Sequence, residues 1–146
     1  ISMNHYSFEE IKIGVQEHFE TQITEEKMKM FTLISGDYNP MHIDHQYAKN
    51  HGFSDKIVYG MLASSLYSTL VGMYLPGEKC LLNKCNVDFR KPVYVGDKLL
   101  IEGKVVDKRE GTRRIRIKAK MINQEGIVVN VAEITVSFTS EKNSYE

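Results

Sequence analysis

The sequence predicts an α+β fold formed by a single domain. Three observations support it: a helical pattern in the first half of the chain, a long uncharged stretch at its centre, and alternating apolar and polar residues in the second half. With 146 residues, the chain is long enough to bury a sizeable core within one domain. We expect this domain to cover residues 3–140 and a polar tail to occupy residues 141–146.

The first predicted helix follows Thr24, whose hydroxyl can cap it, and carries Glu25 and Glu26 in its first turn, where negative charge is favourable. Gly36 can end this helix. Its apolar residues fall on one face, with Phe31 beside them: Met30, Leu33 and Ile34.

Pro40 disfavours a helix in the next segment and favours an extended conformation at Asn39. A short helix is expected from His45 to Asn50. The uncharged stretch then predicts a long helix from about Val58 to Tyr74, which the Pro-Gly pair at 76–77 ends. Its length would suffice to cross a membrane, but its serines, glycines and tyrosines favour the buried helix of a globular domain.

The clearest predicted strand runs from Arg113 to Met121. Its apolar side chains, Ile115, Ile117, Ala119 and Met121, alternate with the basic side chains of Arg114, Arg116, Lys118 and Lys120. The remaining expected strands are Cys85–Arg90, Lys98–Lys108 and Val128–Thr139, with turns in the segments KREGT and NQEG. In the last strand the apolar parity shifts, which predicts either burial of both faces or a bulge near Ala132.

An antiparallel sheet needs a cover for its apolar face, and the central helix is the one element apolar enough to provide it. A sheet wrapped around a single buried helix is the hotdog architecture. The sequence therefore predicts a hotdog domain.

Composition excludes several classes of function. Lys and Arg together number 19, as do Asp and Glu, so no basic excess indicates a nucleic-acid binder. The basic run in the predicted strand is best explained as its solvated face. Cys80 and Cys85 are too few to complete a structural zinc site, and the N-terminus has no secretory signal. These features predict a cytoplasmic protein with free thiols that needs no metal and no cofactor.

The segment GDYNPMHID is the main candidate for chemistry. Asp37 and His42 are five residues apart, and a bend at the Asn-Pro pair between them could let both side chains converge on one water as an acid–base pair. On local sequence alone, an ordinary Asx turn is the better explanation. A metal site built from His42, Asp44 and His45 is a weaker alternative, because no further His or Cys cluster exists.

Gly60 is the second candidate. It stands at the start of the long helix, where a backbone N–H has no partner within the helix and can stabilise an oxyanion. The alternative is that Gly60 only allows tight packing between helix and sheet.

Together these segments resemble the (R)-specific enoyl-CoA hydratases, also called MaoC-like dehydratases. The family signature, Ser-Gly-Asp-x-Asn-Pro-(aliphatic)-His, matches residues 35–42, and Ala48 follows as the family expects. The downstream segment Phe-x-x-x-Ile-Val-His-Gly-Met matches at Phe53, Ile57, Val58, Gly60 and Met61, and the segments FRKPV and GD at 89–93 and 96–97 are also similar. The resemblance extends from about residue 8 to residue 138.

The resemblance implies a hotdog lyase that interconverts trans-2-enoyl-CoA and (R)-3-hydroxyacyl-CoA. It implies that Asp37 and His42 activate the water and that the Gly60 N–H binds the thioester carbonyl. Ser68 matches a serine that borders the family's active site, although a small packing residue is an equally good explanation. The sequence departs from the family at Tyr59, where a histidine is usual, and this leaves the preferred thioester open.

Three further functions fit parts of this pattern. The same chemistry could act on an acyl-carrier-protein thioester, as in a 3-hydroxyacyl-[acyl-carrier-protein] dehydratase. The second function is that of a hotdog thioesterase, and the third is that of a non-catalytic acyl-thioester binding module. A basic patch could bind either an acidic carrier protein or the CoA phosphates: Lys84, Arg90, Lys91, Arg113 and Arg114. The family also pairs its protomers, so we expect a homodimer or a higher homo-oligomer.

Overall fold

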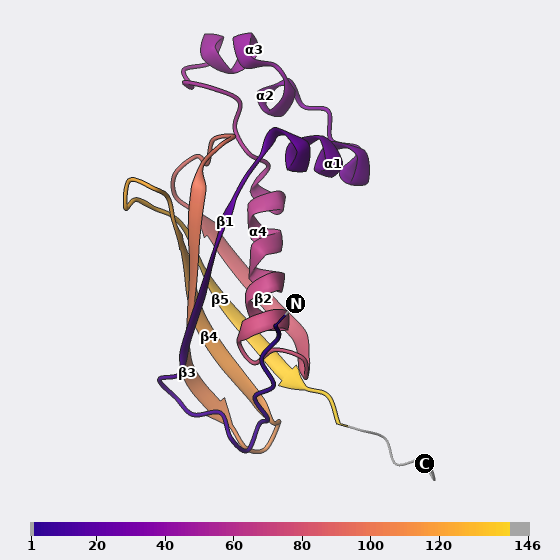
Figure 1. Ribbon diagram of the computed structural model, residues 1–146, viewed down its shortest axis with the longest axis vertical. Coiled ribbons are helices and arrows are strands. Elements are labelled where there is room, and N and C mark those ends of the chain that lie inside the picture. The colour runs from indigo at the N-terminus through magenta and orange to yellow at the C-terminus, as the bar shows by residue number, and fades with distance from the viewer. Residues whose placement is uncertain (1, 141–146) are drawn as a thin grey trace.

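The computed structural model describes residues 2–140, so the predicted tail at 141–146 lies outside the described residues. Its strands form one antiparallel sheet in the order β1-β3-β4-β5-β2, and the sheet wraps around helix α4 (Figure 1). The strands are β1 (Gln16–Gln22), β2 (Cys80–Phe89), β3 (Lys98–Arg109), β4 (Arg114–Ile122) and β5 (Val128–Phe138). The helices are α1 (Glu25–Ser35), α2 (Pro40–Ile43), α3 (His45–Asn50) and α4 (Gly60–Thr69), which a π-helical turn extends through Leu70–Tyr74. The predicted α+β hotdog architecture is confirmed.

The core lies between α4 and the inner face of the sheet. Tyr67 and Leu70 of the helix are buried against the central strands. Gly103 of β3 lets them approach, because a Cβ atom there would stand 2.8 Å from Leu70 Cδ2. Within residues 2–140, no helix is both long enough and apolar enough to cross a membrane.

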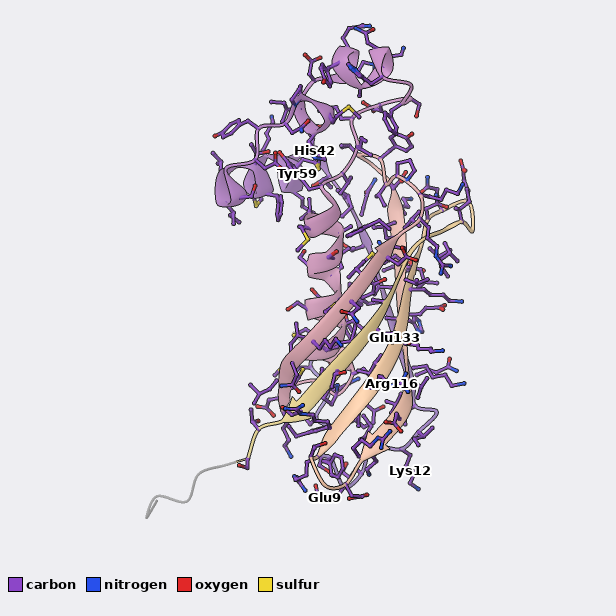
Figure 2. The ribbon with its side chains drawn as sticks, turned by 180° about the vertical axis from the view of Figure 1, so that it is seen from behind. Glu9, Lys12, His42, Tyr59, Arg116 and Glu133 are labelled. Atoms are coloured by element: carbon purple, nitrogen blue, oxygen red, sulfur yellow. The ribbon has the colours of Figure 1, made fainter. Side chains whose placement is uncertain are left out.

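Strand β4 confirms the predicted alternation, since the four apolar side chains predicted to share a face are buried and its basic side chains face outward. On the outer face, Arg116 Nη1 lies 3.7 Å from Glu133 Oε1, and Figure 2 shows both side chains projecting from the sheet. The basic run is therefore a solvated strand face paired with acidic neighbours.

The bulge predicted near Ala132 is displaced. Met121 pairs with Asn130 and Ile122 pairs with Val128, so the extra residue is Val129. The Val129 carbonyl accepts hydrogen bonds from the N–H groups of Arg90 (2.9 Å) and Lys91 (3.0 Å). The bulge thus anchors the segment that follows β2.

Strand β1 was not predicted, because the first half of the chain was interpreted as helical. Its sequence QEHFETQ has one strongly apolar residue, Phe19, and it forms an edge of the sheet by pairing with β3. An edge strand that covers little of the core needs no apolar alternation, so the sequence carries no signal for it.

Helix α1 is confirmed at both ends: the Thr24 hydroxyl accepts a hydrogen bond from the Lys27 N–H, and Gly36 ends the helix with a φ of 71°. Its buried residues are Met28 and Thr32, whereas the predicted apolar face is exposed. Asn39 is extended at ψ 127°, as expected, but the expectation that Pro40 disfavours a helix in the next segment was wrong. Pro40 begins α2, because proline suits the first position of a helix, where its missing N–H is not needed.

Helices α1, α2 and α3 lie together at one end of the molecule, beyond the N-terminal end of α4 (Figure 1). The long segment that joins α1 to α4 therefore passes over the start of the central helix.

Candidate active site

A cavity of about 300 Å³ lies at the N-terminal end of α4. It is lined by Phe31, Ser35, Asp37, His42, Tyr59, Gly60 and Met61. The fold therefore brings three of the four predicted site residues, Asp37, His42 and Gly60, to one cavity. Ser68 does not line it and is exposed on α4 two turns beyond Gly60.

Asp37 is held in a tight turn. Its Oδ1 accepts the N–H of Asn39 at 3.0 Å, and its own N–H donates to Ser35 Oγ at 3.1 Å. The side chain of Asn39 in turn caps α2 by accepting the N–H of Met41 at 3.0 Å. The local explanation, an Asx turn, and the catalytic one are both compatible with this geometry, because only one carboxylate oxygen makes the turn and Asp37 lines the cavity.

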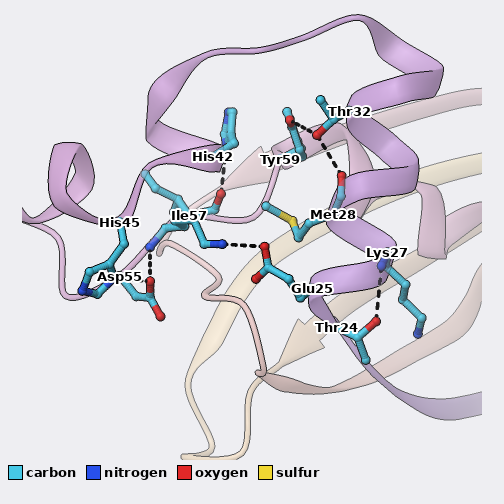
Figure 3. A network of polar contacts seen from close by, with 11 residues as sticks. Thr24, Glu25, Lys27, Met28, Thr32, His42, His45, Asp55, Ile57 and Tyr59 are labelled. Atoms are coloured by element: carbon cyan, nitrogen blue, oxygen red, sulfur yellow. Dashed lines mark hydrogen bonds and ion pairs between the residues drawn. The ribbon is translucent and has the colours of Figure 1, made fainter.

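His42 is half-buried, and its Nδ1 lies 2.7 Å from the Ile57 carbonyl (Figure 3). A carbonyl can only accept, so Nδ1 carries the proton and Nε2 has the free lone pair. Ile57 is itself fixed, since its N–H donates to Met41 O at 3.1 Å and it forms a β-bridge with Tyr94. The Ile57 carbonyl therefore fixes the orientation of the imidazole and leaves Nε2 as its basic nitrogen.

Gly60 is the first residue of α4, and no side chain caps this end of the helix. Its N–H therefore has no partner within the helix and lies at the positive end of the helix dipole. A Cβ atom at Gly60 would stand 3.2 Å from the ring of Phe89, so glycine also relieves crowding. The structure is thus compatible with both explanations given for this glycine.

Tyr59 closes the inner side of the cavity and is only 2% exposed. Its ring stacks on His42 with 4.0 Å between centroids, and its hydroxyl donates to the main-chain oxygen of Asp37 at 2.7 Å. Figure 2 shows Tyr59 and His42 together at the start of α4. Sequence reasoning treated Tyr59 only as a departure from the family, and nothing local predicts a contact that spans 22 residues.

The remaining polar residues of the motif have separate partners. Asp44 caps α3 by accepting the N–H of Tyr47 at 3.1 Å. His45 Nδ1 lies 2.6 Å from Asp55 Oδ1, and this hydrogen bond lowers the pKa of the Asp55 carboxyl (Figure 3). Between residues 2 and 140, no three His, Cys, Asp or Glu side chains gather as a metal site.

A second cavity, of about 290 Å³, shares Gly60 with the first. It is lined by Ile57, Val58, Gly60, Ala63, Phe89, Arg90, Lys91, Pro92, Val93 and Asn130. Of the five basic residues considered as a patch, Arg90 and Lys91 thus lie beside Gly60. Arg113 and Arg114 lie at the β3–β4 turn, at the opposite end of the sheet (Figure 1), and Arg113 is paired with Glu9.

Comparisons with known proteins agree with this geometry. The chain is 29% identical over 130 residues to an (R)-specific enoyl-CoA hydratase from Aeromonas caviae, covering 89% of this chain and 97% of that protein. It is 32% identical over 100 residues to a mitochondrial 3-hydroxyacyl-[acyl-carrier-protein] dehydratase from Arabidopsis thaliana, covering 68% of this chain and 59% of the relative. The structure matches an unliganded R-hydratase from Pseudomonas aeruginosa with a TM-score of 0.85 and 30% identity, over 92% of this chain and 86% of that one. The model of the MaoC-like domain matches residues 8–127, so this chain belongs to the MaoC-like domain family.

Proposed function

We propose that this protein is an (R)-specific hydratase/dehydratase that interconverts trans-2-enoyl-CoA and (R)-3-hydroxyacyl-CoA. The observation that carries the proposal is the single cavity in which Asp37, His42 and the N-terminus of α4 meet. The similarity to (R)-specific enoyl-CoA hydratases along most of the chain supports the same reaction.

In the proposed reaction, the free Oδ2 of Asp37 and Nε2 of His42 hold one water between them. The pair takes a proton from this water as its oxygen bonds to C3 of the enoyl thioester. The electron pair of the C2–C3 double bond moves toward the thioester oxygen, which the Gly60 N–H stabilises. The pair then returns one proton to C2, so the water is fully added and both residues regain their starting state.

The acid–base pair is tested by hydration of crotonyl-CoA, followed as loss of enoyl absorbance. We expect Asp37→Asn and His42→Ala each to lower kcat at least about a hundredfold, the usual contribution of a general acid or base. A fully active Asp37→Asn variant would refute the assignment. Release of free CoA, detected with a thiol reagent, would instead indicate a thioesterase, and CoA binding without turnover would indicate a binding module.

The similarity to acyl-carrier-protein dehydratases supports a second candidate substrate, the carrier-protein thioester. Arg90 and Lys91 beside Gly60 are suited to the phosphates of CoA or to the acidic surface of a carrier. Comparing kcat/KM for crotonyl-CoA and the crotonyl carrier protein separates the two. A preference for the carrier of more than about tenfold, equal to about 1.4 kcal/mol, would overturn the CoA assignment.

We also propose that the protein forms a homodimer through the β2 edge. The register of β2 places Leu82 and Phe89 on the side of the sheet where α4 packs, yet they are 49% and 51% exposed. Met61 of α4 is 68% exposed and follows Gly60, which lies against the Phe89 ring. An unpaired edge next to exposed apolar side chains favours pairing with a second copy, and Ser68 would then lie near the interface. Sedimentation of a monomer at micromolar concentration would contradict the dimer.

The cytoplasmic location and the lack of a cofactor remain predictions from the sequence. Cys80 and Cys85 are free thiols in the described structure, in keeping with the predicted cytoplasmic location. The proposed chemistry uses only amino-acid side chains, backbone and water, so it calls for no cofactor.

A further inference from the structure

Tyr59 contacts both members of the proposed acid–base pair. Its ring lies between His42, at 4.0 Å and an interplanar angle of 28°, and Phe31, at 4.9 Å. Its hydroxyl donates to the Asp37 carbonyl oxygen at 2.7 Å. Its peptide bond leads directly into Gly60, the proposed oxyanion donor. One buried residue therefore contacts two groups of the site through its side chain and is joined to the third through the main chain.

The Tyr59 hydroxyl belongs to a short chain of hydrogen bonds that continues into α1 (Figure 3). Thr32 Oγ1 lies 2.6 Å from the Tyr59 hydroxyl oxygen and 2.9 Å from the Met28 carbonyl. Two hydroxyl protons serve three oxygen–oxygen contacts, so at most two of the contacts can be hydrogen bonds at one time. When Thr32 donates to Tyr59, Tyr59 donates to Asp37, and the turn that carries the carboxylate is tied to the body of α1.

Of these contacts, the bond from the Tyr59 hydroxyl to the Asp37 carbonyl is the one that holds the main chain at Asp37, and through it the direction of the carboxylate. Asp37 Oδ1 is already committed to the N–H of Asn39, so the direction of the second oxygen is set by the main chain at Asp37. Asp37 itself is exposed, and the described contacts that hold its main chain come from Ser35 and Tyr59. His42 is likewise fixed by two contacts, the Ile57 carbonyl at its Nδ1 edge and Tyr59 at its face.

We propose that Tyr59 is a positioning residue that sets the separation of the Asp37 carboxylate and the His42 imidazole. This inference rests on the proposed hydratase function. We assign the Tyr59 hydroxyl no contact with substrate, because its described partners are Thr32 and the Asp37 main chain. Its effect on rate comes through geometry, to which paired acid–base groups are highly sensitive.

The test compares Tyr59→Phe with Thr32→Val. Both variants lose the buried hydrogen bond between these two hydroxyls, but only Tyr59→Phe also loses the bond to the Asp37 carbonyl. Both keep the ring stacked on His42. We expect kcat for crotonyl-CoA to fall about tenfold to a hundredfold in Tyr59→Phe, with KM changed less than about twofold, and to stay within about twofold of wild type in Thr32→Val.

A readout independent of activity separates this inference from the proposed function. Hydrogen exchange of peptides covering residues 36–43 should be at least about tenfold faster in Tyr59→Phe than in wild type or Thr32→Val, because the tether of the turn is lost. Wild-type protein that hydrates neither crotonyl-CoA nor the crotonyl carrier protein would refute the function, and the exchange rates would still test the tether. Equal kcat and equal exchange in the two variants would overturn the positioning role, leaving Tyr59 as packing only.

Discussion

Replacing Gly60 with proline offers a direct test of the proposed oxyanion donor, because proline has no backbone N–H. The backbone at this position accepts proline. Gly60 is the first residue of α4, where proline is favoured, and Tyr59 before it is outside the helical region that proline disfavours, with a ψ of 128°. The change can therefore remove the donor without breaking the helix.

The matched control is Gly60→Ala, which keeps the N–H and adds the same Cβ atom. In both variants this atom meets the Phe89 ring at 3.2 Å, and the ring is 51% exposed, so it can move aside. We expect Gly60→Ala to retain kcat within about tenfold of wild type, since the donor remains. The proline variant should be lower than the alanine variant by a further factor of about 100 to 1,000, the usual loss when one oxyanion donor is removed.

The assay is initial-rate hydration of crotonyl-CoA, with thermal unfolding of both variants to show that they are folded. The proline ring also occupies the space of the N–H hydrogen, so KM for the thioester should rise in the same variant. If Gly60→Pro keeps kcat within about tenfold of Gly60→Ala while both are folded, the N–H does not stabilise the thioester oxygen and the reasoning fails.

Two predictions concern stability. Gly103→Ala should lower the free energy of unfolding, measured by urea titration, by about 1–3 kcal/mol. The reason is that the new methyl group would stand 2.8 Å from Leu70 Cδ2 in a packed core. An unchanged urea midpoint would show that α4 can move away from the sheet. Burial raises the pKa of the Cys80 thiol to about 11. The folded protein thus holds this proton more tightly than the unfolded chain, and the resulting stability is present below pH ~9 and lost as the pH rises toward ~11. Between pH 8 and 11, wild type should lose about 2 kcal/mol more than Cys80→Ala, and parallel pH curves for the two proteins would contradict this.

The sequence predicted those elements whose signal lies in neighbouring residues. The alternation in β4 and the caps of α1 depend on side chains a few positions apart, and both are confirmed. Strand β1 was missed because an edge strand makes its hydrogen bonds through the backbone and needs few apolar side chains. The bulge was displaced to Val129 because its place depends on the register between β4 and β5, which a single strand does not encode.

In the candidate site, too, some residues were indicated by local sequence and others are recognised only in the folded chain. The Asp-x-Asn-Pro-x-His spacing indicated Asp37 and His42, and the helix start indicated Gly60; all three line one cavity. The contacts of Tyr59 with Thr32 and Asp37 span 27 and 22 residues, so only the folded chain reveals them. Ser68 was inferred from resemblance, and it lies on an exposed face where a single chain gives it no role in the cavity.

The bridge between Ile57 and Tyr94 has a mechanical consequence for catalysis. The Ile57 carbonyl orients His42, and the Val58 N–H is bonded to the Val93 carbonyl at 2.7 Å. Val93 lies two residues from Lys91, on the side where the substrate headgroup is proposed to bind. The hydrogen bonds of this bridge thus join the proposed headgroup side of the site to the proposed proton-transfer side, and we expect a displacement of one to shift the other.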